Sequence, residues 1–355
     1  MTDSLAPPAI VTGAPGWLGT ALVRSLVHGL PEVASLAAPP GDRVVRCLVL
    51  RGADASELRA VSRKVEIVEG DVTDAASLEP LFAGAGGGTV FHAAGIIHPT
   101  EGVGQLTRVN VNGTKNILDA ATRAGVRRMV HVSSNSPIGV NPAADHVFDE
   151  SAPYDPYMGY GRTKKLAEEM VREAGDKGAI EAAVIRPPWF YGPGQPPRQT
   201  LFFEMVRDGK APIVGGGENC RSMAYVDNIC QGALLCERVE QAKGQVYWIA
   251  DRRPYTMNEI IDTIERVLED DFSVKVAHRR MRLPGIASQV AWLVDWTLQA
   301  VGIYQQKIHV LSEMNKTIAC SIAKAERELG YDPKVDLEEG MRRSIRWMIE
   351  RGEKL

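Results

Sequence analysis

A tyrosine and a lysine four residues apart, Tyr160 and Lys164, are the side chains of this sequence best suited to chemistry. The surrounding stretch YGRTKKLAEEM predicts a helix that starts near Tyr160, and residues four apart share one face of a helix. A phenol ordinarily loses its proton near pH ~10, and a nearby cation favours the phenolate. We therefore expect Lys164 to bring the pKa of Tyr160 toward neutrality, as acid/base chemistry requires.

This pair needs a second observation, because Tyr-x-x-x-Lys also arises by chance on solvated helix faces. Near the N-terminus, the apolar run 8–11 leads into TGAPGWLG and then into an apolar helical pattern. Strand, glycine turn and helix in this order are typical of a dinucleotide site. Gly13 permits the turn, Gly16 lets backbone approach a pyrophosphate, and Gly19 lets the helix pack on the strand. We interpret the segment as a cofactor site rather than a simple turn.

The composition sets limits on the function. With 355 residues, 45% of them hydrophobic, the chain can bury a large core and is expected to form two lobes. The formal charge of −3 argues against nucleic acid as the main partner. The five cysteines lack paired metal spacing, the histidines are scattered, and no apolar leader precedes the first strand. We expect a cytoplasmic protein without a metal site.

Strand and helix signals alternate through the first half of the chain. Apolar strands are predicted at 44–50, 65–68, 89–93 and 129–132, with helix-like segments between them and a surface loop at 36–41. Such alternation predicts an α/β fold, a doubly wound parallel Rossmann sheet. Proline and glycine become frequent after Pro187. We therefore assign residues 1–187, with roughly 223–250, to a cofactor-binding domain, and 188–222 and 251–355 to a smaller C-terminal substrate-binding lobe.

Ordered motifs along nearly the whole chain resemble those of the extended short-chain dehydrogenases/reductases, the group of NAD-dependent epimerases/dehydratases. The glycine turn matches TGxxGxxG of that family, and the other matches are GDVTD at 70–74, HAAG at 92–95, NVNGTKN at 110–116, VSS at 132–134, RPPWFYGPG at 186–194, YVDN at 225–228 and KAERELGY at 324–331. In the family, NVxGTxN marks the start of a helix. The resemblance implies a Rossmann fold and a nicotinamide cofactor.

The resemblance also implies roles for four catalytic residues. Ser134 would hold the substrate oxygen, and Tyr160 would donate or accept the proton. Lys164 would activate Tyr160 and hold the nicotinamide ribose, with Asn110 as the supporting residue behind it. Ser133 is the alternative for the hydroxyl role, although a serine at a strand end also bonds to backbone.

The cofactor would be held by residues from four of these motifs and by the pair of Tyr160 and Lys164. Asp71 and Val72 would contact adenine, and the backbone of Pro187 would border the nicotinamide. For Asp71, the alternative is an ordinary turn aspartate. The full set implied is Gly13, Gly16, Trp17, Leu18, Gly19, Asp71, Val72, Ala93, Ala94, Gly95, Tyr160, Lys164 and Pro187.

The end of the second strand predicts the choice of cofactor. An acid there bonds the 2′-hydroxyl of NAD, whereas an arginine accommodates the 2′-phosphate of NADP. The strand CLVL runs into Arg51, and no acid follows until Asp54. We expect NADP(H) to be preferred, with NAD(H) as the alternative and a solvated surface arginine as the other interpretation of Arg51.

The sequence says less about the substrate. Trp189 and Phe190 stand where nucleotide-sugar enzymes of the family carry Asn, and Asn135 and Ser136 replace the Asp-Glu of dehydratases. The chain instead resembles hydroxysteroid dehydrogenases and dihydroflavonol reductases, which implies a mainly apolar ketone or secondary alcohol as substrate. Arg221 stands where the sugar enzymes keep a phosphate-binding arginine, or is a surface charge of the lobe. The expected substrate residues are Ser134, Ser136, Trp189, Phe190 and Arg221.

Two other functions stay open. A nucleotide-sugar epimerase would use Ser134, Tyr160 and Lys164 with tightly held NAD, whereas a non-catalytic redox sensor would keep only the fold. The apolar stretch 286–303 is helical in period but is interrupted by Gln289, Asp295 and Gln299. We favour core packing for it over a lid or a membrane-surface helix, and expect no membrane span. We expect a homodimer.

Overall fold

The computed structural model describes residues 6–39 and 41–353, and it is built on one parallel sheet of seven strands. The strand order is β11-β6-β5-β4-β1-β2-β3, which is the dinucleotide-binding order 3-2-1-4-5-6 with one further strand at the edge. The predicted Rossmann fold is confirmed. The strands are β1 (Ala6–Thr12), β2 (Arg43–Val49), β3 (Val65–Glu69), β4 (Thr89–His92), β5 (Arg128–Val132), β6 (Glu181–Arg186) and β11 (Val246–Trp248).

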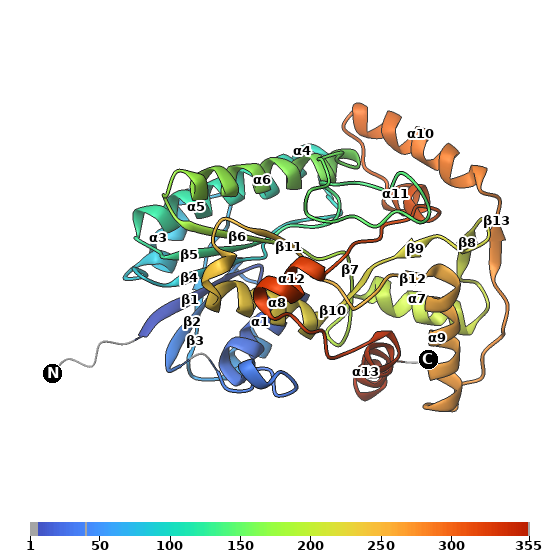
Figure 1. Cartoon of the computed structure of the whole chain (residues 1–355), viewed down its shortest axis with the longest axis horizontal. Coiled ribbons are helices and arrows are strands. Elements are labelled where there is room, and N and C mark those ends of the chain that lie inside the picture. The colour runs from blue at the N-terminus through green and yellow to red at the C-terminus, as the bar shows by residue number, and fades with distance from the viewer. Residues whose placement is uncertain (1–5, 40, 354–355) are drawn as a thin grey trace.

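Helices cover both faces of this sheet (Figure 1). One face carries α1 (Trp17–His28), α2 (Ser56–Val61), α8 (Val226–Arg238) and α12 (Ala323–Leu329). The other carries α3 (Glu79–Phe82), α5 (Gly113–Arg123) and α6 (Met158–Asp176). Because neither face meets water, every residue of β4 and β5 is buried, including the polar residues Thr89, His92, Arg128 and His131.

The helix expected to begin at Asn110 begins earlier. A short turn, α4 (Gly104–Leu106), continues through a π-helical turn (Thr107–Asn112) into α5. Asn110 therefore lies inside the wide turn rather than at a helix start, and π-turns of this kind often sit at functional sites. Likewise α6 begins at Met158, two residues before Tyr160.

Besides α8 and α12, the described part of the C-terminal half forms three small two-stranded sheets and five helices. The sheets pair β7 (Trp189–Tyr191) with β10 (Met223–Tyr225), β9 (Cys220–Arg221) with β12 (Tyr255–Thr256), and β8 (Pro212–Val214) with β13 (Met281–Leu283). The helices are α7 (Pro197–Arg207), α9 (Met257–Asp270), α10 (Ile286–Ala300), α11 (Gln306–Glu313) and α13 (Leu337–Glu350). The proposed domain division stays a prediction. Two contacts are relevant to this division: β11 pairs with β6 in the main sheet, and α12 packs on α8 and β11.

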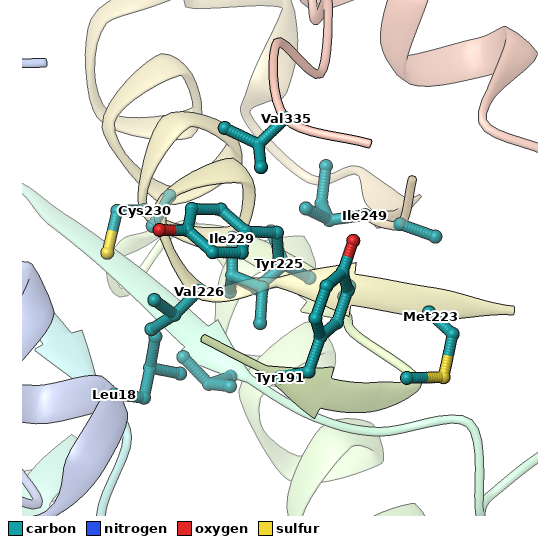
Figure 2. Close-up of a cluster of buried hydrophobic side chains, with 14 of the residues drawn as sticks. Leu18, Tyr191, Met223, Tyr225, Val226, Ile229, Cys230, Ile249 and Val335 are labelled. Carbon is teal, nitrogen blue, oxygen red and sulfur yellow. The ribbon is translucent and has the colours of Figure 1, made fainter. Parts of the chain in front are cut away.

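A buried cluster joins the two halves where β7 and β10 lie beside α8 (Figure 2). The rings of Tyr191 and Tyr225 meet edge to face with their centroids 5.6 Å apart. The Tyr191 hydroxyl donates to a carboxylate oxygen of buried Asp251 at 2.6 Å. The tyrosine of the YGPG motif is thus part of the core, and it fixes the start of the smaller lobe against the Rossmann sheet.

The predicted boundary of the surface loop 36–41 is wrong at its first residue, Leu36. Leu36 ends a short 3₁₀ turn (Ala34–Leu36) and is fully buried in the core. Position 40 lies outside the described residues. Over residues 6–39 and 41–353, we find no helix whose length and apolar character would let it cross a membrane.

Candidate active site

The glycine turn between β1 and α1 is too tight for side chains. Gly13 has φ of +87°, and a Cβ there would lie 2.7 Å from the Ala93 carbonyl carbon. A Cβ on Gly19 would lie 2.5 Å from the Gly13 oxygen. Gly16 caps α1 without any side-chain hydrogen bond, so the first N–H groups of the helix are left for a ligand. The turn therefore fits the pyrophosphate of a nicotinamide dinucleotide.

Tyr160 and Lys164 lie on the first turns of α6, as the spacing predicts. The Lys164 ammonium is buried and donates to the Val132 carbonyl at the end of β5, at 2.8 Å. Burial lowers the pKa of Lys164 to about 8, and the Glu168 carboxylate opposes the shift. The lysine is thus anchored at the carboxyl edge of the sheet, beside the glycine turn.

The pKa of Tyr160 moves in the direction opposite to the prediction. Burial raises the pKa of Tyr160 to about 12, while a hydrogen bond with Ser134 and the positive charge of Arg198 pull it down. Lys164 is not among the groups that shift the pKa of Tyr160, and its ammonium donates to the Val132 carbonyl. The expected lowering toward neutrality by Lys164 is therefore wrong for this structure, and Tyr160 is a protonated hydroxyl at neutral pH.

Three serines follow β5, and they divide between two environments. Ser134 and Ser136 are buried with their hydroxyls 3.3 Å apart, on the side that faces Tyr160. Ser133 points elsewhere and donates to the Glu168 carboxylate at 2.8 Å. That carboxylate also binds the Arg186 guanidinium. Ser133 therefore holds a structural ion pair, and Ser134 is the hydroxyl near the tyrosine.

Asn110 links the segment that follows the HAAG motif to helix α6. Its side chain accepts from the Ile96 amide at 2.8 Å and donates to the Ile96 carbonyl at 2.9 Å. The same amide nitrogen donates to the Thr163 hydroxyl at 3.2 Å, next to Lys164 in the chain. Asn110 is therefore placed to position the lysine helix rather than to contact the lysine itself.

A buried histidine braces the strands behind the glycine turn. His92 lies between the hydroxyls of Thr12, at 2.7 Å, and Thr114, at 2.9 Å. Burial and the positive charge of Lys164 lower the pKa of His92 to about 3, so the ring is neutral. The Thr12 hydroxyl also accepts from the Ala94 amide at 3.2 Å. These bonds fix the HAAG loop against the turn at Gly13.

The residues expected at the adenine and nicotinamide ends lie around the same edge. Asp71 accepts from the Thr73 amide at 2.8 Å, which is the turn role considered for it. The side chains of Val72 and Leu18 are buried in the core, and Gly95 lies against Asn110. Pro187 lies in the link between β6 and β7. Their contacts with a cofactor stay predictions.

Arg51 lies in the turn directly after β2, and it is exposed. The nearest acid in sequence, Asp54, accepts from the Ser56 amide at 2.8 Å. This bond lowers the pKa of Asp54 and ties its carboxylate to the start of α2. An arginine therefore stands at the strand end, while the acid is engaged in a local turn.

Three of the proposed substrate residues lie on two strands of the smaller lobe, Trp189 and Phe190 on β7 and Arg221 on β9. Phe190 packs against Trp17, with ring centroids 6.0 Å apart, and the Trp17 indole donates to the Pro193 carbonyl at 2.7 Å. Trp189 packs against the Phe202 ring at 5.8 Å and lies 6.0 Å from the guanidinium carbon of Arg221. Arg221 suggested a nucleotide sugar as substrate and Trp189 an apolar molecule, yet the two side chains are neighbours in the structure.

Sequence reasoning missed two residues near the tyrosine. Arg198, at the start of α7, is close enough for its charge to lower the pKa of Tyr160. Gln299, on α10, accepts from the Gly159 amide at 3.0 Å. Neither residue belongs to a motif, and each reaches the site through the packing of the smaller lobe. The interruption of the apolar stretch by Gln299 was the one available signal.

The chain is similar to known proteins over most of its length. A model of the 3-beta hydroxysteroid dehydrogenase/isomerase family matches residues 10–278. The uncharacterized protein y4nL of Sinorhizobium fredii (strain NBRC 101917 / NGR234) is 51% identical over 349 residues, which are 98% of this chain and 97% of that protein. The 3-beta-hydroxysteroid dehydrogenase of Mycolicibacterium neoaurum is 31% identical over 358 residues, covering 94% of this chain and 88% of the relative.

A solved structure shows the same arrangement of elements. The dTDP-glucose 4,6-dehydratase DesIV of Streptomyces venezuelae, with NAD and TYD bound, superposes with a TM-score of 0.74 at 27% identity. The match covers 97% of this chain and 98% of that one. The likeness therefore extends through the smaller lobe as well as the Rossmann sheet.

Proposed function

The chain belongs to the 3-beta hydroxysteroid dehydrogenase/isomerase family, within the extended short-chain dehydrogenases/reductases, and from this premise we propose its reaction. It is an NAD(P)-dependent enzyme of the oxidoreductase or epimerase kind. The proposal is that it reduces a ketone, or oxidises a secondary alcohol, on a mainly apolar small molecule with NADP(H). The observation that carries it is the protonated Tyr160 hydroxyl beside Ser134.

Each residue has a task in this reaction. A bound nicotinamide supplies or takes the hydride at the substrate carbon. Ser134 holds the substrate oxygen by a hydrogen bond, and Tyr160 gives that oxygen its proton in the reductive direction. Because the pKa of Tyr160 is about 12, the hydroxyl keeps its proton at neutral pH until an oxyanion develops beside it. Lys164 would hold the nicotinamide ribose.

Arg51 supports the preference for NADP(H). A guanidinium at the end of β2 suits a 2′-phosphate, whereas NAD enzymes place an acid there for the 2′-hydroxyl. The acid closest in sequence, Asp54, is bound to the amide of Ser56 instead. We propose that Arg51 binds the 2′-phosphate as a charge-assisted pair.

The aromatic residues of β7 support a mainly apolar substrate. Trp189 and Phe190 are half buried on the strand that follows Pro187 and Pro188. Aromatic rings of this kind contribute large contact area to an apolar ligand. The relative in Mycolicibacterium neoaurum is a 3-beta-hydroxysteroid dehydrogenase by name, which supports a flat, polycyclic alcohol or ketone as a substrate class.

One observation favours a second candidate, a nucleotide-sugar epimerase. Arg221 is held in the lobe beside Trp189. Among the residues that the structure describes, its guanidinium has two hydrogen bonds, both long at 3.4 Å, to the carbonyls of Glu313 and Lys316. Such a cation has capacity left for a diphosphate. An epimerase would also retain NAD through purification, because its hydride returns to the same substrate.

A turnover screen separates these candidates. Purified protein is mixed with NADPH or NADH and a panel of steroid, aliphatic and aromatic ketones, and the absorbance of the reduced cofactor is followed. We expect turnover of at least one apolar ketone with NADPH and slower turnover with NADH. Copurified NAD together with interconversion of UDP-sugars would instead establish the epimerase. Tight NADPH binding without any turnover would favour the redox sensor.

A further inference from the structure

Helix α10 turns a polar stripe toward the protein. Ser288, Asp295 and Gln299 are buried on that side, and Asp295 is fully buried. A carboxylate taken out of water is costly unless it is hydrogen-bonded and paired with a positive charge. The partners of Asp295 therefore indicate what this acid does in the fold.

Two side chains hold the Asp295 carboxylate, one at each oxygen. The ring of buried His309, on α11, donates from Nδ1 to Oδ2 at 2.7 Å. The Gln299 amide donates from Nε2 to Oδ1 at 3.0 Å. Because a carboxylate only accepts, it draws the nitrogen of the Gln299 amide toward itself and leaves the amide oxygen for another donor.

That amide oxygen meets the start of α6. It accepts the Gly159 amide hydrogen at 3.0 Å, and Gly159 directly precedes Tyr160 in the chain. The approach is close, since a Cβ on Gly159 would lie 2.9 Å from the same oxygen. Three hydrogen bonds in series thus connect His309, through Asp295 and Gln299, to the helix that carries Tyr160.

His309 packs against two tyrosine rings and faces a second carboxylate. Its ring centroid is 6.0 Å from that of Tyr157 and 5.4 Å from that of Tyr304. Its Nε2 atom lies 4.0 Å from a carboxylate oxygen of Glu313. Burial by itself would lower the pKa of His309, but the hydrogen bond with Asp295 and the charges of Glu313 and Asp295 raise this pKa above its ordinary value. Both acids therefore favour the positive form of the ring.

The other described titratable groups around His309 are uncharged at neutral pH. Burial raises the pKa of Tyr157 and of Tyr304, so both hydroxyls keep their protons. The Tyr304 hydroxyl bonds to the His98 ring at 2.5 Å. Burial lowers the pKa of His98 to about 4, so that ring is neutral. The charge of this cluster therefore resides on His309 and its two acids.

We propose that Asp295 and His309 are positioning residues for the candidate active site, and that their opposite charges hold the Gln299 amide in the orientation that caps α6. Among the described contacts, neither side chain is bonded to Tyr160, so both act through Gln299. When His309 loses its proton, the ring still donates from Nδ1, but the Asp295 carboxylate is left buried without a counter-charge. The cap on Gly159 should then weaken, and the first turn of α6 should open more often.

The direction of the pH effect follows from the raised pKa of His309. Because this pKa is higher in the folded protein than in the unfolded chain, the pair stabilises the fold fully below the ordinary histidine value of about 6.5. That contribution is lost as the pH rises through the folded-state pKa. Opening of the start of α6 should therefore increase on the alkaline side.

Hydrogen exchange in the full chain tests this proposal without substrate or cofactor. The amide of Gly159 is followed by mass spectrometry at about pH 6 and about pH 9, and each variant is compared with the unchanged protein at the same pH. His309→Asn keeps a donor near Nδ1 but cannot become charged. We expect exchange at Gly159 to be ~10-fold faster in this variant at the lower pH, and nearly equal to that of the unchanged protein at the higher pH.

His278→Asn is the matched control. This exposed histidine is bonded to Glu269 on α9, and that pairing also raises its pKa, so the variant should leave exchange at Gly159 unchanged. Asp295→Asn removes the negative charge of the pair. Its effect should not add to that of His309→Asn, because both break the same interaction. Thermal unfolding establishes that each variant is folded.

Turnover gives a second readout, and this readout alone rests on the proposed function. With NADPH saturating, kcat of the unchanged protein should decline on the alkaline side. His309→Asn should be ~3–10-fold slower at the lower pH and lack that decline, with an unchanged dissociation constant for NADPH. Absence of turnover with every ketone would count against the proposed function and leave the exchange result standing.

Two exchange results would overturn the proposal. The first is exchange at Gly159 in folded His309→Asn that equals the exchange of the unchanged protein at the lower pH. The second is exchange that is faster by the same factor at both pH values, since the charge of His309 would then have no role in the cap.

Discussion

The side-chain oxygen of Gln299 accepts the amide hydrogen of Gly159 at 3.0 Å, so α10 caps the helix that carries Tyr160 and Lys164. The first residues of α6 have no side-chain cap of their own, and Met158 starts the helix with φ of +53°. An acceptor at a helix N-terminus is worth roughly 0.5–2 kcal/mol. The catalytic helix therefore depends for its start on a residue more than a hundred positions later in the chain.

Replacement of this cap gives the first prediction. Gln299→Ala should lower the free energy of unfolding by about 1–2 kcal/mol and reduce kcat, because the Gly159 amide loses its buried partner. Thermal unfolding and steady-state kinetics measure both effects. Gln289→Ala, on the exposed side of the same helix, is the control and should change neither. If both variants behave alike, the cap has no role in placing Tyr160.

Removal of the Tyr160 hydroxyl tests the proton donor. Tyr160→Phe keeps the ring and removes the only dissociable proton, so kcat should fall by roughly 10²–10⁴-fold. The dissociation constant for NADPH, measured by fluorescence titration, should remain nearly unchanged. Tyr247→Phe, at the far edge of the sheet, serves as the control. Near-normal turnover of Tyr160→Phe would assign the proton to another group.

Arg51 is predicted to select the phosphorylated cofactor. A charge-assisted hydrogen bond contributes about 1.5–3 kcal/mol, so Arg51→Ala should raise the dissociation constant for NADPH by ~10-fold or more. Binding of NADH should change little, because it has no 2′-phosphate. Arg63→Ala, another exposed arginine near the same strands, provides the comparison. Equal weakening for both cofactors would show that Arg51 does not select between them.

The contact between Trp189 and Arg221 distinguishes the substrate classes. If the substrate is mainly apolar, Trp189→Ala should raise KM for a hydrophobic ketone more than Arg221→Ala does. Because the guanidinium carbon lies 6.0 Å from the indole ring, the two changes should not add, and the double variant should fall short of their sum. The kinetics of all three variants test this. A larger effect of Arg221→Ala, with micromolar binding of a UDP-sugar, would favour the epimerase.

The pKa of Lys164 predicts a pH limit for cofactor binding. Burial lowers this pKa from its ordinary 10.5 to about 8, so the ammonium loses its proton around pH 8, whereas an exposed lysine stays charged up to about pH 10. Below pH 8 the charged lysine can hold the ribose, and above pH 8 that interaction should weaken. Titration of NADPH binding between pH 7 and 10 should show a loss of affinity that Lys164→Met lacks. Parallel profiles for the two proteins would contradict the role.

Much of the fold was accessible from the sequence because its signals are local. Apolar runs bounded by turn residues predicted strands that agree with β2, β3, β4 and β5 to within one or two residues. The glycine turn could be read in the same way, since Gly13 needs a backbone conformation that other residues avoid. The family resemblance rested on such short segments, and the comparison with known families confirmed it.

The environment of each side chain was decided by the tertiary structure. The i, i+4 spacing put Tyr160 and Lys164 on one helix, but burial set the direction in which the pKa of each side chain moves, and the effect on Tyr160 was the reverse of the expected one. The sequence could not distinguish Ser133 from Ser134. In the structure, Ser133 donates to the Glu168 carboxylate, and Ser134 hydrogen-bonds with Tyr160. Both outcomes depend on residues that are far apart in the sequence but close together in the fold.

Helix α10, which begins at Ile286, shows most clearly the difference between what the sequence predicts and what the tertiary structure decides. Its periodicity predicted a helix, and periodicity alone cannot tell which side faces the protein. Hydrogen bonds to Gly159 and His309 hold the buried polar residues Gln299 and Asp295 toward the protein. Ile286, Leu293 and Trp296 are exposed, so the core packing that we favoured for this stretch is wrong. The sequence by itself therefore determined the elements, the motifs and the family, because these depend on neighbours in the chain. Only the folded structure decided the charges, the partners and the exposed face, because these depend on residues that meet across long separations.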